Sequence, residues 1–317
     1  MTKLFVDGAE GTTGLRINDY LSVRPDIEVI QIEPALRKDQ HERARCLNAA
    51  DIAILCLPDA ASKESVAMID SAGNTHTRVL DASTAFRIAP DWAYGLPELT
   101  RGQREKIKQA KRVAGPGCHA TGFILLTRPL IESGVLSPDA LLTCTSLTGY
   151  SGGGKKLIAK YDSAANPEAL AADPYALELK HKHLPEMTVQ TGLTVAPIFM
   201  PVVARMLQGM LVTIPLHLKQ LGNGISRQDL HDVLSQHYTG ERCIYLMPLD
   251  NGADLNEGFL DPTACNGTNR VDLFVFGNDT QALLVARLDN LGKGAAGAAM
   301  QCLNLMMGVD EFAGLKV

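Results

Sequence analysis

Short apolar runs alternate with amphipathic segments along the first hundred residues of the chain. The runs lie at 3–8, 27–34, 49–58 and 78–83, and the third is apolar without a break, as in a strand covered on both faces. Residues 61–73 repeat apolar positions with helical spacing and stop at a glycine. Strands that alternate with helices in this way predict a parallel, Rossmann-like α/β sheet.

The pattern changes after residue 118. Residues 140–154 predict a strand that ends in a glycine-rich loop, and a polar, helix-forming stretch follows at 155–187. Long strands are expected within 192–218 and 270–290, the second range folding as a hairpin about "GNDTQ". This half predicts an α+β domain with a mainly antiparallel sheet. The tail, 291–309, is an Ala/Gly/Met-rich helix with no polar face, so it must pack against an apolar surface.

Composition narrows the class of protein. A length of 317 residues suits two domains, and a net charge of −5 offers no basic surface for nucleic acid. No apolar run approaches the roughly 18 residues of a membrane span, and the N-terminus enters a strand directly, without a signal peptide. The seven cysteines are odd in number and widely spaced, which favours reduced thiols in a cytoplasmic protein over disulfides or a metal site.

A glycine-rich turn lies between the first strand and the first helix. Gly8, Gly11 and Gly14 allow the backbone to approach a pyrophosphate at a helix N-terminus, and we predict that Thr12 and Thr13 also bind the cofactor. The acidic residue typical of NAD binding is present as Glu33, but two cations that suit a 2′-phosphate follow it, Arg37 and Lys38. The residues alone leave NAD and NADP open. Ser83, at a predicted strand end, is a further cofactor-binding candidate.

Cys118 stands in "GPGCHATGF", after a rigid turn and at the predicted start of a helix. A cysteine at a turn is most often a buried apolar residue. At a helix N-terminus, however, the dipole favours the thiolate, which next to a dinucleotide domain suggests acyl-enzyme chemistry with hydride transfer. Pro129 is expected to end or kink this helix about three turns on.

Two further segments carry candidate chemistry. His181 and His183, in "HKHLPE", share a face if the segment is extended, and either could serve as a general base near the cysteine. A metal site needs more ligands than this pair supplies, so no metal is predicted. Ser151 and Gly152, in "TGYSGGGKK", are candidates for contact with substrate or phosphate through the hydroxyl and the neighbouring amides.

Taken in order, the motifs resemble the N-acetyl-γ-glutamyl-phosphate reductase family, in its shorter second type, within the superfamily of aspartate-semialdehyde and glyceraldehyde-3-phosphate dehydrogenases. The resemblance runs through nearly the whole chain and rests on "GAEGTTG", "DIAILCLPDAAS", "VLDASTAFR", "YGLPEL", "GPGCHATG", "TGYSGGGKK", "HKHLPE", "NGTN" and "DNLGKGAAGAAMQCLN". In one departure, His119 follows the cysteine where the longer type commonly has Tyr, which removes an expected phenol on the substrate side.

The resemblance implies the reduction of N-acetyl-γ-glutamyl phosphate by NADPH, in arginine biosynthesis, through a thioacyl group on Cys118. Inorganic phosphate is released, and the product is N-acetyl-glutamate 5-semialdehyde. His183 is expected to move the proton, His181 to contact substrate, and Asn290 to lie near the nicotinamide. The implied domains are an NADP-binding domain of 1–117 and 292–317 and a catalytic domain of 118–291, in a homodimer or homotetramer.

Three other functions remain open at this point. Aspartate-semialdehyde dehydrogenase, or a reductase of carrier-linked aminoadipyl phosphate, keeps the chemistry and changes the substrate. A protein that senses NADP without turnover keeps the cofactor and leaves Cys118 unreactive.

Overall fold

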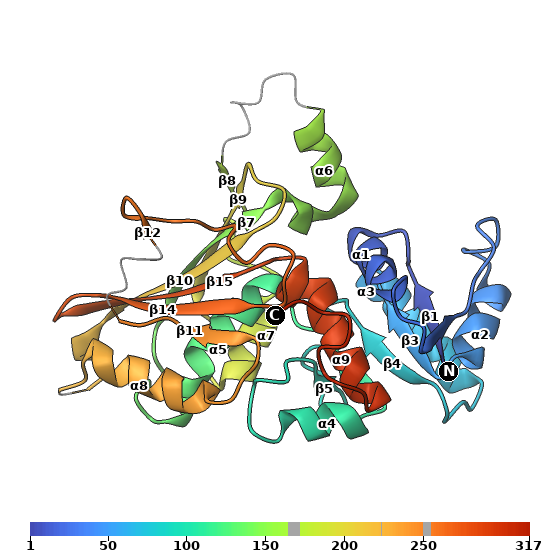
Figure 1. Cartoon of the computed structure of the whole chain (residues 1–317), viewed down its shortest axis with the longest axis horizontal. Helices are drawn as coiled ribbons and strands as arrows, with labels where there is room; N and C mark the ends of the chain where they lie inside the picture. Colours follow the sequence, from blue (N-terminus) through green and yellow to red (C-terminus); the bar gives the residue numbers. More distant parts are fainter. Residues whose placement is uncertain (164–171, 223, 250–254) are drawn as a thin grey trace. The chain divides into compact units, whose positions relative to one another are not determined.

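A computed structural model describes residues 1–163, 172–222, 224–249 and 255–317. The chain divides into two compact units, one of residues 1–116 with 295–315 and one of residues 117–294 with 316–317. Each unit has its own main sheet (Figure 1). Within the polar stretch expected to form helix, residues 164–171 lie outside the described part of the chain.

The first unit is built on a six-stranded parallel sheet in the order β2-β1-β3-β4-β6-β5, which confirms the predicted Rossmann-like class. The second strand is shorter than the apolar run that predicted it. The strands are β1 (Thr2–Asp7), β2 (Ile27–Val29), β3 (Ile52–Leu55), β4 (Arg78–Asp81), β5 (Ala93–Tyr94) and β6 (Arg112–Ala114). The helices are α1 (Thr12–Leu21), α2 (Gln40–Ala49), α3 (Asp59–Ser71), α4 (Gln103–Gln109) and, from the end of the chain, α9 (Gly297–Met307).

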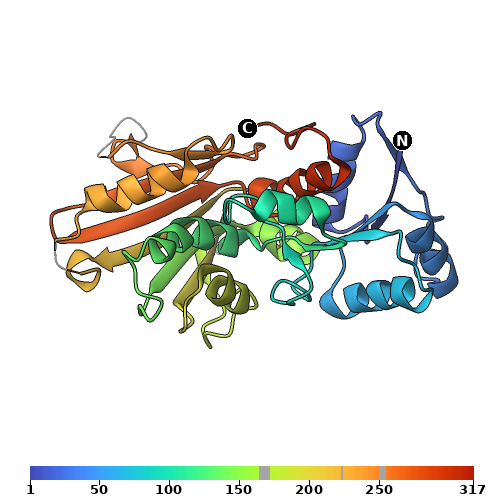
Figure 2. The ribbon, with the colours of Figure 1, turned by 90° about the horizontal axis from the view of Figure 1, so that it is seen from below.

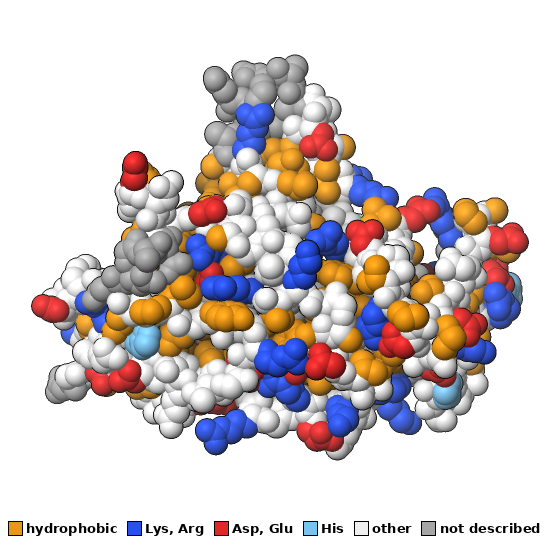
Figure 3. Space-filling view, viewed as in Figure 1, with side chains coloured by type: hydrophobic (Ala, Val, Ile, Leu, Met, Phe, Trp, Pro, Cys, Tyr) orange, Lys and Arg blue, Asp and Glu red, His pale blue; other side chains and the backbone are white. Residues whose placement is uncertain are grey.

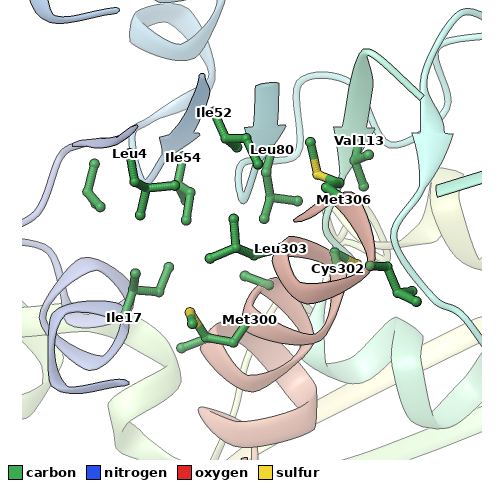
Figure 4. Close-up of a cluster of buried hydrophobic side chains, with 14 of the residues drawn as sticks. Leu4, Ile17, Ile52, Ile54, Leu80, Val113, Met300, Cys302, Leu303 and Met306 are labelled. Atoms are coloured by element: carbon green, nitrogen blue, oxygen red, sulfur yellow. The ribbon is translucent and has the colours of Figure 1, made fainter. Parts of the chain in front are cut away.

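Helix α9 lies inside the core of the first unit, which explains why its sequence has no polar face. Met300, Cys302 and Leu303 pack against residues from the strands, among them Ile54 and Leu80, and all five are at most 1% exposed (Figure 4). A helix that is apolar on every face is stabilised when all its faces are buried. The predicted C-terminal helix is therefore confirmed as a core element.

The second unit has a seven-stranded mixed sheet in the order β11-β14-β15-β10-β7-β9-β8. Four of the six strand pairings are antiparallel, and the parallel ones are β7 with β9 and β11 with β14, so the prediction of a mainly antiparallel sheet is confirmed. The strands are β7 (Thr143–Gly149), β8 (Ala172–Pro174), β9 (Ile198–Ala204), β10 (Met210–His217), β11 (Ile244–Leu246), β14 (Val271–Gly277) and β15 (Gln281–Leu288), and a separate two-stranded ladder joins β12 (Leu255–Asn256) to β13 (Phe259–Leu260).

Helices cover one face of this sheet (Figure 2). They include α5 (Cys118–Glu132) and α8 (Arg227–Tyr238), while α7 (Leu184–Thr191) packs on α5 and α6 (Gly154–Asp162) follows the glycine-rich loop. Helix α5 approaches strand β10 so closely that a Cβ on Gly122 would lie 2.7 Å from a methyl group of Val212. The glycine therefore sets the distance between this helix and the sheet.

Helix α5 continues beyond Pro129 to Glu132, so of the two predicted effects of this proline, an end or a kink, the end of the helix is wrong. Proline has no N–H, so the carbonyl of Leu125, four residues before Pro129, lacks its usual hydrogen bond within the helix. The hydroxyl of Tyr238, on α8, donates a 2.6 Å hydrogen bond to that carbonyl instead. A tertiary contact thus replaces the missing bond of the helix, and a sequence pattern cannot reveal it.

The surface carries both signs of charge. Over the described part of the face shown in Figure 3, Lys and Arg are interspersed with Asp and Glu, without an extended patch of one sign. Among the helices of the described residues, none is both long and apolar enough to cross a membrane.

Candidate active site

The glycine-rich turn of the first unit follows β1 and opens α1. Gly8 has a φ of +87°, and a Cβ there would lie 2.4 Å from the carbonyl oxygen of Cys56. A Cβ on Gly14 would lie 2.5 Å from the carbonyl oxygen of Gly8. Both positions therefore require glycine, and the turn brings bare backbone to the end of the sheet, beside the N-cap residue Gly11.

The turn fits a dinucleotide on two observations. Thr12 and Thr13 open α1, where the first amide groups have no partner within the helix. The Oγ1 of Thr12 is buried and has no hydrogen-bond partner among the described residues. Orphaned donors at a helix start are what a bound pyrophosphate satisfies.

The other predicted cofactor-binding residues lie in different environments. The side chain of Arg37 pairs with Glu10, which places its guanidinium beside the glycine turn, and Lys38 is exposed. Ser83 is buried and donates a 2.6 Å hydrogen bond to Asp81, whose pKa is raised by burial. The hydroxyl of Ser83 therefore serves the strand end in this structure, and its contact with a cofactor stays a prediction.

Cys118 is the first residue of α5, in the second unit, and its side chain is partly exposed. The N-cap, Gly117, is extended, with φ −81° and ψ 149°, so the chain turns sharply into the helix at the thiol. Burial raises the pKa of Cys56 and of Cys265 to about 12 and also raises that of Cys144. Those three thiols stay protonated, whereas Cys118 stands where the helix dipole favours a thiolate.

Gly294 packs directly on the cysteine. It lies in a π-helical turn, Gly292–Ala296, and a Cβ on it would lie 2.8 Å from the Cβ of Cys118. Turns of this kind are frequent at functional sites. The absence of a side chain at 294 therefore allows Cys118 to occupy this position.

Glu186 connects the histidine segment to the start of α5. Its Oε2 accepts a 3.1 Å hydrogen bond from the backbone N–H of Gly117, and its Oε1 lies 4.0 Å from the Nε2 of His183. Glu186 and His183 are 1% and 5% exposed. The carboxylate thus bonds to the residue that precedes Cys118 and lies beside the imidazole of His183.

The two predicted histidines are brought together, although their segment is not extended. His183 is the N-cap of α7, which Pro185 helps to start, and the rings of His181 and His183 lie 4.7 Å apart, edge to face. The Nδ1 of His181 accepts a hydrogen bond from the backbone N–H of His183, at 3.1 Å. Among the described residues, no group of three or more His, Cys, Asp or Glu side chains is placed to hold a metal ion.

Ser151 and Asn290 meet in the same unit. The Nδ2 of Asn290 donates to the Oγ of Ser151 at 3.0 Å, and its Oδ1 accepts from the backbone N–H of Gly209, also at 3.0 Å. Both side chains are buried, whereas Gly152 is exposed. Asn290 therefore fixes the loop that carries the two predicted substrate residues, and its place near a nicotinamide stays a prediction.

Sequence reasoning missed three residues of this site. Glu186 was visible as the acid of "HLPE", three residues from His183, the spacing of neighbours on a helix. Gly294 was one of several glycines in "LGKGAAG", and nothing in the sequence singled it out. Tyr175 lies far along the chain from His119, which its hydroxyl contacts at 3.0 Å, so only the fold reveals the pair.

One unit has a glycine turn at the end of a parallel sheet. The other has a cysteine at a helix start, near a histidine and a buried carboxylate, beside a mixed sheet. These features define the semialdehyde dehydrogenase class of enzymes, and two family models agree. Residues 32–110 match "Semialdehyde dehydrogenase, NAD binding domain", and residues 118–290 match "Semialdehyde dehydrogenase, dimerisation domain". The chain is 49% identical to N-acetyl-γ-glutamyl-phosphate reductase 2 of a Nostoc species, over 99% of both chains. It is also 49% identical to the reductase of Brucella suis, over 96% of this chain and 99% of that one. The chain belongs to the N-acetyl-γ-glutamyl-phosphate reductase family, as the sequence motifs predicted.

Solved structures support the fold independently. An aspartate-semialdehyde dehydrogenase from Francisella tularensis superposes with a TM-score of 0.71 at 15% identity, over 97% of this chain and all of that one. Aspartate-semialdehyde dehydrogenase II from Vibrio cholerae gives 0.69 at 16% identity, over 97% of this chain and 98% of that one. At these identities the likeness shows the architecture alone.

Proposed function

We propose that this protein reduces N-acetyl-γ-glutamyl phosphate to N-acetyl-glutamate 5-semialdehyde, with NADPH as the reductant, in arginine biosynthesis. The observation that carries the proposal is the position of Cys118, partly exposed at the first turn of α5, with Glu186 linking its N-cap to His183. The near-full-length identity to reductases of this name supports the choice of substrate. Seven free cysteines agree with a cytoplasmic location.

The residues of the second unit suit acyl transfer to sulfur. The thiolate of Cys118 attacks the acyl carbon, the carbon–oxygen bond to phosphate breaks, and inorganic phosphate leaves with the electron pair. The N–H groups at the start of α5 stabilise the oxyanion that forms. A nicotinamide cofactor, when bound, supplies the hydride that reduces the thioester. His183 gives a proton to the alkoxide oxygen that hydride addition leaves, and then removes that proton as the carbon–sulfur bond breaks. The aldehyde is released, and the sulfur leaves as the Cys118 thiolate.

A reverse assay tests the substrate. Purified protein is mixed with NADP and phosphate, and NADP reduction is followed with N-acetyl-glutamate semialdehyde, aspartate semialdehyde or an aminoadipate semialdehyde carrier. We expect reduction only with the first. Activity confined to aspartate semialdehyde would contradict the proposal, and tight NADP binding without any turnover would favour a sensor.

We assign the preference for NADPH over NADH to Arg37. The residue lies beside the glycine turn through its pair with Glu10, where a guanidinium can bind a 2′-phosphate. We predict that Arg37→Ala raises the KM for NADPH about tenfold or more and leaves the KM for NADH unchanged, because one charge-assisted contact is lost. Lys108→Ala, an exposed cation on α4, is the matched control. An equal change for both cofactors would contradict this role.

We assign the uncovered face of the second sheet as the interface between the subunits of a homo-oligomer. Ile198 and Met200 on β9 and Leu283 on β15 are 56%, 44% and 37% exposed, while Phe199, between the first two, is buried on the opposite face. An exposed apolar sheet face of this kind marks an interface, and the matched family model is named for dimerisation.

Met200→Glu tests the interface, because a carboxylate buried between two copies is costly. We predict a dimer or tetramer for the wild type and a monomer for the variant, measured by size-exclusion chromatography with light scattering. Leu141→Glu, at a site that is 81% exposed outside the sheet, serves as the control. A variant with the wild-type mass would show that this face is not the interface.

A further inference from the structure

His119, the second residue of α5, joins two hydroxyl groups from distant parts of the second unit. It is 2% exposed. Its Nδ1 lies 2.8 Å from the Oγ of Ser146, on β7, and its Nε2 lies 3.0 Å from the Oη of Tyr175, just after β8. The rings of His181 and Phe199 stand edge-on against it, at 5.4 and 5.2 Å. The imidazole is thus enclosed by aromatic rings and held at both nitrogens.

The contacts of Ser146 fix which nitrogen of His119 carries the proton. Ser146 is fully buried, and its hydroxyl has no second hydrogen-bond partner among the described residues. A buried hydroxyl uses its proton, so Ser146 donates to Nδ1. Nε2 then carries the hydrogen of the neutral ring and donates to Tyr175. The proton of the Tyr175 hydroxyl is left to point away from His119.

His119 stays neutral throughout the working pH range. Burial, assisted by the charges of His181 and Lys182, lowers its pKa to about 3. The other titratable groups around it are His183, at 5.4 Å between rings, Tyr175 and the adjacent Cys118. A ring that does not titrate cannot exchange protons with substrate, but it can hold a neighbour in place.

Tyr175 lies within the electrostatic reach of Cys118. Burial raises the pKa of the phenol, and the negative charge of the Cys118 thiolate raises it further. The phenol therefore stays protonated, so its O–H remains available as a hydrogen-bond donor while its oxygen accepts from His119. Its backbone is held as well, because the N–H of Tyr175 donates to the carbonyl of Pro201 at 3.1 Å.

We propose that Tyr175 is a hydrogen-bond donor to the reacting acyl group beside Cys118 and that His119, donating through Nε2, is a positioning residue that aims it. During the reaction the phenol donates to the carbonyl oxygen of the acyl group held on the sulfur of Cys118. This inference rests on the proposed function for its substrate class, an acyl phosphate or thioester. It adds a side-chain donor to the backbone N–H groups of α5.

Steady-state kinetics of four variants test the pair. Tyr175→Phe is expected to lower kcat about 100-fold with little change in KM, the usual effect of losing one donor to a developing oxyanion. His119→Asn keeps an acceptor near Ser146 and loses the donor at Nε2, so a similar loss is expected. His119→Gln places an amide N–H where Nε2 was and recovers most of the activity. Tyr245→Phe, on β11, is the control.

Two further readouts separate positioning from proton transfer. The double variant Tyr175→Phe with His119→Asn is expected to lose no more than either single variant, because one side chain acts through the other. The pH profile of kcat in His119→Asn is expected to keep the shape of the wild-type profile, because His119 does not titrate in that range. Losses that multiply, a changed pH profile, or a fully active Tyr175→Phe would each overturn the proposal.

Alkylation of Cys118 by iodoacetamide requires no substrate and so tests the inference apart from the proposed function. The thiolate loses a nearby O–H dipole in Tyr175→Phe, and in His119→Asn that dipole is no longer aimed, so the apparent pKa of alkylation is expected to rise in both variants. Tyr245→Phe is expected to leave it unchanged. An unshifted pKa in the first two variants would overturn the proposal whichever acyl phosphate the wild type reduces.

Discussion

Cys118→Ser is expected to lower the rate of reduction by about 1,000-fold or more, the scale of losing a covalent nucleophile, while NADP binds as before. Serine keeps the size of the side chain at the start of α5, but its hydroxyl is not ionised at neutral pH, so attack on the acyl carbon is lost. The glycine turn lies in the other unit and does not change. Initial rates with N-acetyl-glutamate semialdehyde, and NADP titration by fluorescence, measure the two properties.

A matched variant controls for the general loss of a thiol. Cys144 is fully buried on β7, and its pKa is raised by burial, so it has no part in the chemistry. Cys144→Ala is expected to keep kcat near the wild-type value. If Cys118→Ser retained substantial activity, or if both variants lost it equally, a nucleophilic role for Cys118 would be wrong.

Gly294→Ala is expected to lower kcat about 100-fold. The added Cβ would lie 2.8 Å from the Cβ of Cys118, closer than real side chains approach, and 3.2 Å from its Cα, which is also tight. The sulfur must therefore shift, and a displacement of about 1 Å costs roughly that factor when a nucleophile has to meet its target. Steady-state kinetics give the loss, and the rate of iodoacetamide alkylation reports the sulfur directly.

Gly102→Ala is the matched control, because a Cβ there meets nothing within 4 Å. It is expected to leave both kinetics and alkylation unchanged. A thermal melt distinguishes local displacement from unfolding, since Gly294→Ala should remain folded. Wild-type kcat in Gly294→Ala would contradict the claim that this glycine sets the position of the thiol.

The sequence predicted the kinds of elements well because their signals are local. The unbroken apolar run of 49–58 gave β3, and the glycine turn before α1 and the "GPG" turn before Cys118 gave the two helix starts that matter for function. The apolar tail was recognised as a buried helix for the same reason. In each case, side chains within a few residues determine the local structure.

The contacts that the sequence did not predict join residues far apart in the chain. The hydroxyl of Tyr238 reaches the carbonyl of Leu125 across 113 positions of the sequence and so sustains α5 past Pro129. Glu186 reaches Gly117 across 69 positions, and Tyr175 reaches His119 across 56. Such contacts follow from how helices and strands pack, so no periodicity or spacing in one sequence announces them.

The central claim is that Cys118 carries the acyl group, and intact mass spectrometry tests it most directly. The protein is mixed with N-acetyl-glutamate semialdehyde and NADP in the absence of phosphate, so that no acceptor removes the acyl group, and is then quenched in acid. The account predicts a mass increase of one N-acetyl-glutamyl group, mapped to the peptide of Cys118 and absent from Cys118→Ser. Turnover on addition of phosphate without any such adduct, or an adduct on another residue, would contradict it.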